Sequence, residues 1–231
     1  MAIVLLGGGI IDYRGSVSGN TFSRSRFGVT VRGKVSPVQV SSSFKGRPKS
    51  LLVRFSRGWS QSITEAQRAE WNSFALTNPS TNVFGQVSYL SGQQWFVKYN
   101  VNSFLSGGIL IEEPPASSGY AGLDSLTIEA TAGGTDEILI TASATEPPGT
   151  PFIHLLITRC LSPGIYYANG QFKDCGFLAY TAAETDIISN WSTRYVNLSL
   201  QAGKKLYCLA NLIDQDSGKV SPSIMASCTI A

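Results

Sequence analysis

The sequence predicts a mainly β protein with a small α+β N-terminal part: an extended arm, a helical hairpin plus one further helix, and a C-terminal antiparallel β-sandwich of about seven strands. Composition is the first observation, because 43% hydrophobic and 14% charged residues, with 23 glycines among 231 residues, are typical of a globular, β-leaning chain. Helical periodicity is confined to residues 46–111, and short β-prone runs separated by turn signals fill residues 120–231. These two patterns divide the chain.

Residues 1–45 are predicted to form an extended basic arm. Small polar residues alternate there with single valines, aromatic residues and cations, and only the stretch from Val29 to Arg32 has the period-two pattern of a strand. The apolar start of the chain lacks the basic region and the cleavage site of a signal peptide, so we expect synthesis in the cytoplasm. Because such a ribbon cannot bury itself, we expect it to add to the sheet of a neighbouring subunit.

Residues 46–111 are predicted to form a small helical docking domain. An apolar stripe at helical spacing follows Pro48 and includes Leu52, Phe55 and Trp59. Two Ser/Thr-x-x-Gln capping boxes predict the starts of two more helices. These boxes are Thr64 with Gln67 and Ser91 with Gln94. We expect the first two helices to form a hairpin and a pair of glycines to end the third helix.

Residues 112–119, Glu-Glu-Pro-Pro-Ala-Ser-Ser-Gly, are the clearest linker in the chain. The β-prone runs that follow have the spacing of a small antiparallel sandwich, and no helix is required among them. They span residues 126–131, 138–144, 152–160, 165–180, 195–200, 205–213 and 220–230. The segment 200–221, with its Gln-Ala-Gly-Lys-Lys and Asp-Gln-Asp-Ser-Gly-Lys turns, resembles the last hairpin of fibronectin type III-like domains. The resemblance implies an Ig- or fibronectin III-like sandwich over residues 120–231 and no particular function.

The sequence contains no recognisable catalytic, cofactor-binding or metal site. His154 is the only histidine and the four cysteines have no Cys-x-x-Cys spacing, so neither a zinc site nor a nucleophilic triad is indicated. We interpret the cysteines as small apolar residues on buried strand faces. Asp214-x-Asp216-x-Gly218 opens like a calcium loop but lacks the remaining ligands, so a turn explains it better. We therefore expect a non-enzymatic protein without cofactors, and no apolar run is long enough to indicate a membrane partner.

Charge divides the chain into two parts of opposite sign. Residues 1–68 hold eleven Lys or Arg against two acids, a net charge of +9, and residues 69–231 hold seven against thirteen, a net charge of −6. Arm and body can therefore attract each other, within one chain or between copies. Arginines interleaved with phenylalanines would also suit nucleic acid, although the cations are too dispersed for that to be the favoured partner. The anchors that we expect at subunit contacts are Arg24, Arg26, Phe27, Arg32, Trp59 and Trp71.

Aromatic residues in the C-terminal part leave a second class of function open. Tyr166, Tyr167, Trp191 and Tyr195 would suit stacking on the sugars of a host surface if their rings are exposed. The competing interpretation is ordinary aromatic packing inside the sandwich. A glycan-binding or host-surface-binding module is therefore the alternative to a structural subunit, and a nucleic-acid-binding protein that uses the basic arm is the second alternative.

Three groups of spaced residues in the first half of the chain form one pattern. They are Gly15-x-x-x-Gly19-Asn20-x-Phe22-x-Arg24, Thr64-x-x-Gln67-Arg68-x-x-Trp71 and Leu90-Ser91-Gly92-x-x-x-Phe96-x-x-Asn100. Over residues 13–108 this pattern resembles uncharacterised proteins of environmental bacteria and their phages, and it departs from them between Pro37 and Lys45. The resemblance implies a phage-type structural protein: a capsid, decoration or tail component of a virion, with copies of itself and other virion proteins as partners.

Overall fold

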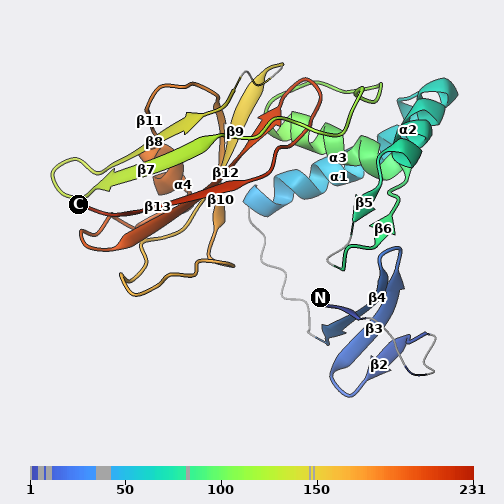
Figure 1. The fold of residues 1–231 in the computed structure, drawn as a ribbon, viewed down its shortest axis with the longest axis horizontal. Coiled ribbons are helices and arrows are strands. Elements are labelled where there is room, and N and C mark those ends of the chain that lie inside the picture. The colour runs from blue at the N-terminus through green and yellow to red at the C-terminus, as the bar shows by residue number, and fades with distance from the viewer. Residues whose placement is uncertain are drawn as a thin grey trace.

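The computed structural model describes residues 2–4, 8, 12–34, 43–81, 84–145, 147 and 149–231. Over these residues the protein is mainly β, with four helices and antiparallel sheets. Figure 1 shows three regions in chain order: a small N-terminal sheet, a unit of three helices, and a C-terminal β region at the other end of the long axis. The predicted mainly β class with a small α+β N-terminal part is therefore confirmed at this level.

The N-terminal sheet has four antiparallel strands in the order β1-β4-β3-β2. Its strands are β1 (Ala2–Val4), β2 (Gly15–Val17), β3 (Asn20–Ser25) and β4 (Gly28–Gly33). The sequence predicted an extended arm, and the described residues instead pair locally. The reason is turn geometry: Ser18 and Gly19, at φ 47° and 86°, form a two-residue hairpin turn between β2 and β3. Positive φ at both positions gives the turn a twist that matches that of the two strands. Residues 35–42 of the predicted arm lie outside the described residues. Residues 43–45, its predicted end, form the start of α1.

The helical unit consists of three helices and a two-stranded ribbon. Its elements are α1 (Ser43–Gln61), α2 (Glu65–Thr77), β5 (Ser80–Thr81), β6 (Val87–Ser88) and α3 (Gly92–Leu105). Both predicted capping boxes are present, with Thr64 and Ser91 accepting from the backbone of the glutamine three residues later. Helix α1 begins before Pro48, which lies inside it. Phe55, Trp71, Phe96 and Tyr99 are fully buried aromatic side chains at the centre of this unit.

The C-terminal β region contains two antiparallel sheets, in the orders β10-β9-β12-β13 and β11-β8-β7. Its elements are β7 (Ser125–Thr131), β8 (Glu137–Ser143), β9 (Pro151–Ile157), β10 (Lys173–Ala179), β11 (Thr185–Asp186), α4 (Ile188–Arg194), β12 (Lys205–Asp214) and β13 (Ile224–Thr229). Inward-facing aliphatic side chains of both sheets belong to one core cluster, because the alternate residues of β7, β8, β9 and β12 are buried.

Helix α4 is the element that the sequence did not predict. The run 195–200, expected as a strand, follows this helix and forms no strand. Trp191 and Tyr195 explain the helix: the Trp191 indole N–H donates to Thr158 O at 3.0 Å, and the Tyr195 hydroxyl donates to Ile157 O at 2.8 Å. Both bonds go to the end of β9, so tertiary contacts hold a seven-residue helix that has no side-chain N-cap.

The helical unit is docked on the C-terminal β region through the turn after β12. Asn102 donates to Gly218 O at 3.1 Å, and Ser103 donates to Gln215 O at 2.7 Å. Gly218 has φ 65°, and a Cβ at this position would overlap Tyr99 O, so glycine is required both for the backbone conformation and for the close approach. The turn thus fixes α3 against the body.

The same turn decides the interpretation of Asp214. Its carboxylate accepts from the backbone N–H groups of Thr150 at 3.1 Å, Asp216 at 3.4 Å and Ser217 at 3.2 Å. These donors use the oxygens that a calcium ion would need, which confirms the turn interpretation.

No helix among the described residues is both long enough and apolar enough to cross a bilayer.

Candidate functional site

The six predicted anchor residues do not form one surface. Arg24, Arg26, Phe27 and Arg32 lie on the N-terminal sheet or its turn, Trp59 lies on α1, and Trp71 lies on α2. Their surroundings differ in burial and in bonding partners.

Arg24 and Arg32 are exposed cations. Arg24 Nη1 lies 3.7 Å from Asp12 Oδ2, and Arg14 Nε lies 2.9 Å from the same oxygen. Pairs this exposed contribute little stability, because water and salt screen them. Arg32 is exposed on β4 and its side chain forms no ion pair with any described residue. Both arginines therefore remain accessible to a partner.

Arg26 makes a contact within the chain. Its Nη1 donates to Tyr89 O at 2.6 Å and to Gln94 Oε1 at 3.0 Å. Tyr89 precedes α3 and Gln94 lies in its first turn, so Arg26 joins the turn between β3 and β4 to the start of this helix. The neighbouring Phe27 is half-buried at the same turn. Arg26 thus positions the N-terminal sheet on the helical unit.

Trp71, one of the six predicted anchors, is a core residue. Its side chain is 0% exposed and lies among Phe74, Phe96 and Tyr99, with ring centroids about 6 Å away in each case. Its indole N–H donates to Glu112 O at 2.8 Å, which ties the start of the 112–119 segment to α2. No neighbouring subunit can contact Trp71 while the helical unit is folded.

Trp59 is half-buried and packs on the edge of this core. Its ring centroid lies 5.6 Å from that of Phe96. Most of its surface is therefore used within the chain, and only its outer edge remains for a neighbour.

The N-terminal sheet has an apolar face that the described residues cover only in part. Cross-strand partners share a face, so the pairs Phe22 with Val31 and Arg24 with Val29 place these side chains together, and the register of β2 adds Val17. We call Val17, Phe22, Val29 and Val31 the apolar face. Val17 is 59% exposed, and Tyr13, which packs on Phe22 at 4.9 Å, is itself 41% exposed. Val29 and Thr30 are the only buried residues between positions 12 and 34.

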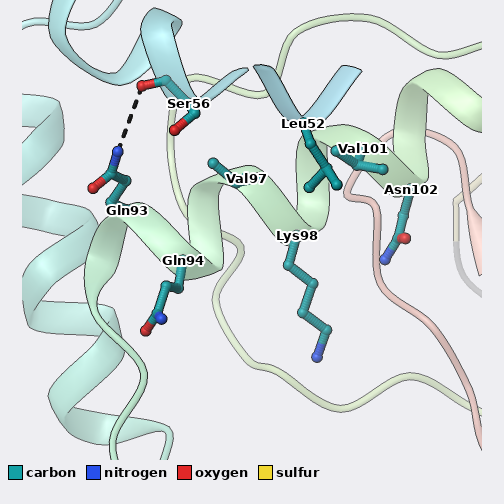
Figure 2. A pocket seen from close by; sticks show the side chains of 8 residues that line it. All are labelled: Leu52, Ser56, Gln93, Gln94, Val97, Lys98, Val101 and Asn102. Atoms are coloured by element: carbon teal, nitrogen blue, oxygen red, sulfur yellow. Dashed lines mark hydrogen bonds between the residues drawn. The ribbon is translucent and has the colours of Figure 1, made fainter. Parts of the chain in front are cut away.

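A second accessible surface is an open groove between α1 and α3. We call it the α1–α3 groove; it has a volume of about 550 Å³. Its lining residues are Leu52, Ser56, Gln93, Gln94, Val97, Lys98, Val101 and Asn102. Figure 2 shows Leu52 beside Val101, with Gln93 donating across to Ser56 O and Lys98 extending from α3. The sequence placed Leu52 on the buried stripe, whereas it is 49% exposed.

Lys98 gives this groove its charge. Its Nζ lies 4.5 Å from the centroid of the Trp95 ring, a cation–π distance. Burial lowers the pKa of Lys98 below its ordinary value, because the surrounding side chains desolvate the ammonium group. A carboxylate from a partner would offset this loss of solvation.

The aromatic residues proposed for sugar stacking separate into two groups. Tyr166 and Tyr167 are 81% and 73% exposed, while Trp191 and Tyr195 are buried beneath β9 and β10. Lys205 Nζ lies 4.1 Å from the Tyr166 ring, and Asn169 donates to the Tyr167 hydroxyl at 2.6 Å. Only the tyrosine pair remains as a surface for glycans.

Comparison with known proteins adds no relative: no protein-family model, curated protein or solved structure matches this chain significantly. The function must therefore be argued from the surfaces described above. Among the described residues no cluster of His, Cys, Asp or Glu has the arrangement of a metal site.

Proposed function

We propose that this chain is a non-enzymatic structural subunit of a repetitive assembly, in which the N-terminal sheet of one copy packs on a neighbouring copy. The observation that carries the proposal is the apolar face of this sheet. A small sheet is stable in water when its apolar face packs on something, and here Val17 is 59% exposed and Tyr13, which packs on Phe22 of this face, is 41% exposed. A neighbouring subunit would supply the missing cover.

Charge favours another copy of the same chain as this neighbour. Arg32 and Lys34 are exposed on the sheet, while residues 69–231 of every copy carry a net charge of −6. Opposite fields of this kind orient subunits as they meet and disfavour the wrong register. Every copy in a homo-oligomer has both an N-terminal sheet and an acidic part formed by residues 69–231. The contact between the two can therefore repeat from copy to copy.

The kind of assembly follows from the resemblance of residues 13–108 to phage-type structural proteins. In this proposal the chain is a virion component, in a capsid, decoration or tail layer, and the C-terminal β region is an Ig- or fibronectin III-like sandwich that faces outward. The C-terminal β region would suit that position, because most exposed residues on its outer strand faces are uncharged, as on β7 and β13.

Removing residues 1–34 tests the proposal. The full chain is expected to form oligomers in size-exclusion chromatography with light scattering, and the truncated chain is expected to stay folded and to form clearly smaller oligomers or a monomer. Phe22→Ser with Val31→Thr provides a milder variant, which keeps the strands and makes the apolar face polar. Leu76→Ser is the matched control, since Leu76 is 71% exposed on α2, outside the sheet. A truncated chain that assembles like the full chain would overturn the proposal.

The exposed tyrosine pair favours one second candidate, a glycan-binding module. Tyr166 and Tyr167 present adjacent rings to solvent, and sugar rings stack on such faces. Replacing both by alanine is expected to abolish retention on a glycan array if this function holds, while Tyr120→Ala, a half-buried tyrosine of the C-terminal β region, serves as the comparison. Equal retention by parent and double variant would exclude the pair as the binding surface.

A further inference from the structure

Helix α1 presents an exposed face that is both basic and apolar. Between Ser43 and Gln61 the helix has no acidic residue. Lys49 and Arg57 are exposed there, and their side chains form no ion pair with any described residue. Between them Leu52 and Val53 are 49% and 51% exposed. Two accessible aliphatic side chains flanked by cations are typical of a surface that another protein covers.

The α1–α3 groove continues this surface onto α3. Val97 and Val101 are partly buried against the helical core and still line the groove, and Lys98 adds a cation at its rim. Coverage by an acidic, weakly apolar surface would bury the aliphatic side chains and would place carboxylates near three cations.

The outer face of the β11-β8-β7 sheet has the complementary chemistry. Glu129 of β7 pairs with Leu139 of β8, and Leu139 pairs with Asp186 of β11, so one row reads acid, aliphatic, acid. Glu137 lies one row further along β8. We call Glu129, Glu137, Leu139 and Asp186 the acidic face.

Nothing on these strands neutralises the acidic face. β7, β8 and β11 contain no Lys or Arg, and neither Glu129 nor Glu137 forms an ion pair within the described part of the chain. Leu139 is half-buried and Glu129 and Glu137 are exposed, so the face offers a small aliphatic patch beside two exposed carboxylates. The Asp186 carboxylate adds negative charge to the row while it accepts from the backbone N–H groups of Ile138 and Ile188.

We propose that the exposed face of α1, together with the α1–α3 groove, binds in one copy the acidic face of a second copy. This inference rests on the proposed function, since it adds a second subunit contact to the one that the N-terminal sheet makes. Groove and acidic face cannot meet within one chain, because the β11-β8-β7 sheet lies at the left end of the long axis in Figure 1 and α1 and α3 lie to the right of the four-stranded sheet. The contact is therefore head to tail.

A head-to-tail contact has a structural consequence. Each subunit that uses its groove still has a free acidic face, so the contact repeats until a ring closes or a filament grows. A two-fold dimer, in which one patch meets its own copy, would instead bring Lys49 and Arg57 against the same cations and is disfavoured by like-charge repulsion.

Charge reversal on each patch tests the contact. One variant carries Lys49→Glu with Arg57→Glu, and the other carries Glu129→Lys with Glu137→Lys. Sedimentation velocity of each variant alone is expected to show association at least tenfold weaker than that of the parent chain. A one-to-one mixture is expected to regain association, because the unchanged groove of the second variant meets the unchanged acidic face of the first, and the two reversed patches also match.

Matched controls carry the same charge changes at other exposed positions. They are Arg159→Glu with Lys173→Glu, and Glu70→Lys with Glu113→Lys. Circular dichroism and thermal melting establish that all variants are folded. The controls are expected to associate like the parent chain, and raised salt is expected to weaken the parent and the rescued mixture alike.

Three results would overturn the inference. Patch variants that associate like their controls would exclude these surfaces, and a mixture that fails to regain association would exclude their mutual pairing. A groove variant that loses only its retention on an oligonucleotide column would identify nucleic acid as the occupant. In each case deletion of residues 1–34 still decides the proposed function separately, whereas a parent chain that stays monomeric contradicts both proposals.

Discussion

The N-terminal sheet and the C-terminal β region are both antiparallel, yet they are stabilised in different ways. In the C-terminal β region alternate residues of β7, β8, β9 and β12 enter a shared core. In the N-terminal sheet Val29 and Thr30 are the only buried residues from position 12 to position 34. Regular strand pairing therefore does not by itself make a stable domain, since burial of apolar surface contributes most of the stability.

The two regions also differ in how they are attached to the helices. The C-terminal β region holds α3 through a glycine turn and several partly buried hydrogen bonds, as at Ser103 and Gln215. The N-terminal sheet is held by the exposed side chain of Arg26. We therefore expect the helical unit and the C-terminal β region to unfold together and the N-terminal sheet to open separately.

The largest expected effect is Trp191→Ala. Removing this fully buried ring leaves a cavity beside β9 and leaves Thr158 O without its donor, so the free energy of unfolding should fall by about 3–5 kcal/mol. Phe22→Ala in the N-terminal sheet should change it by less than about 0.5 kcal/mol. Urea denaturation measures both, and a large loss from Phe22→Ala would show that the sheet belongs to the main folding unit.

Gly218→Ala should break the contact between the helical unit and the C-terminal β region. The new Cβ overlaps Tyr99 O and occupies a backbone at φ 65°. Gly203→Ala is the matched control, because Gly203 has φ 75° but open space around it. We expect Gly218→Ala to lose about 1–3 kcal/mol more than the control. Equal losses in thermal melts would mean that strain alone, and not docking, makes glycine necessary.

Arg26→Gln should release the N-terminal sheet with little effect on global stability. Loss of the bonds to Tyr89 O and Gln94 Oε1 weakens docking by about 0.5–1.5 kcal/mol for each hydrogen bond. Hydrogen exchange of residues 12–34 should become faster while the urea midpoint stays unchanged. Arg24→Gln, which removes only a pair with Asp12, should leave the exchange as in the parent chain.

The smallest expected effect concerns pH. Burial raises the pKa of Asp174, but hydrogen bonds from His154 at 3.2 Å and from the Gly176 N–H at 2.8 Å outweigh it and hold this pKa below its ordinary value. Because the pKa of Asp174 is lower in the folded state, the ionised carboxylate stabilises the fold at pH values above the pKa of the unfolded chain. This stabilisation is lost as the pH falls through the folded-state pKa. Asp174→Asn should flatten the acid limb of a stability curve below about pH 4 by less than ~1 kcal/mol, because the pair is partly exposed. An unchanged acid limb would contradict this assignment.

Local patterns were sufficient for the elements whose stability is largely local. The capping boxes at Thr64 and Ser91 were visible because three residues define each box. Strands β7, β8 and β12 lie within a residue or two of the predicted runs, since alternation marks a strand with one buried face. The N-terminal hairpins were missed because the left-handed pair Ser18 and Gly19 is a weak signal in a segment rich in serine and glycine.

The candidate surfaces were harder to predict, because exposure depends on contacts between distant segments. Trp71 and Trp191 have surface-like sequence neighbours and are nevertheless completely enclosed, whereas Leu52 belongs to an apolar stripe and is half exposed. The acidic face depends on the register of three strands, β7, β8 and β11, which brings Glu129 and Asp186 to the same row from positions far apart in the chain.

The separation of charge, the helix starts and the strand alternation can be read from the chain alone, because composition and neighbouring residues define them. Contacts between distant segments fix which aromatic rings are buried, where the groove lies and which acids share a face. The physical reason is that burial and register depend on long-range packing, and a single side chain can satisfy its own local pattern on either side of an interface.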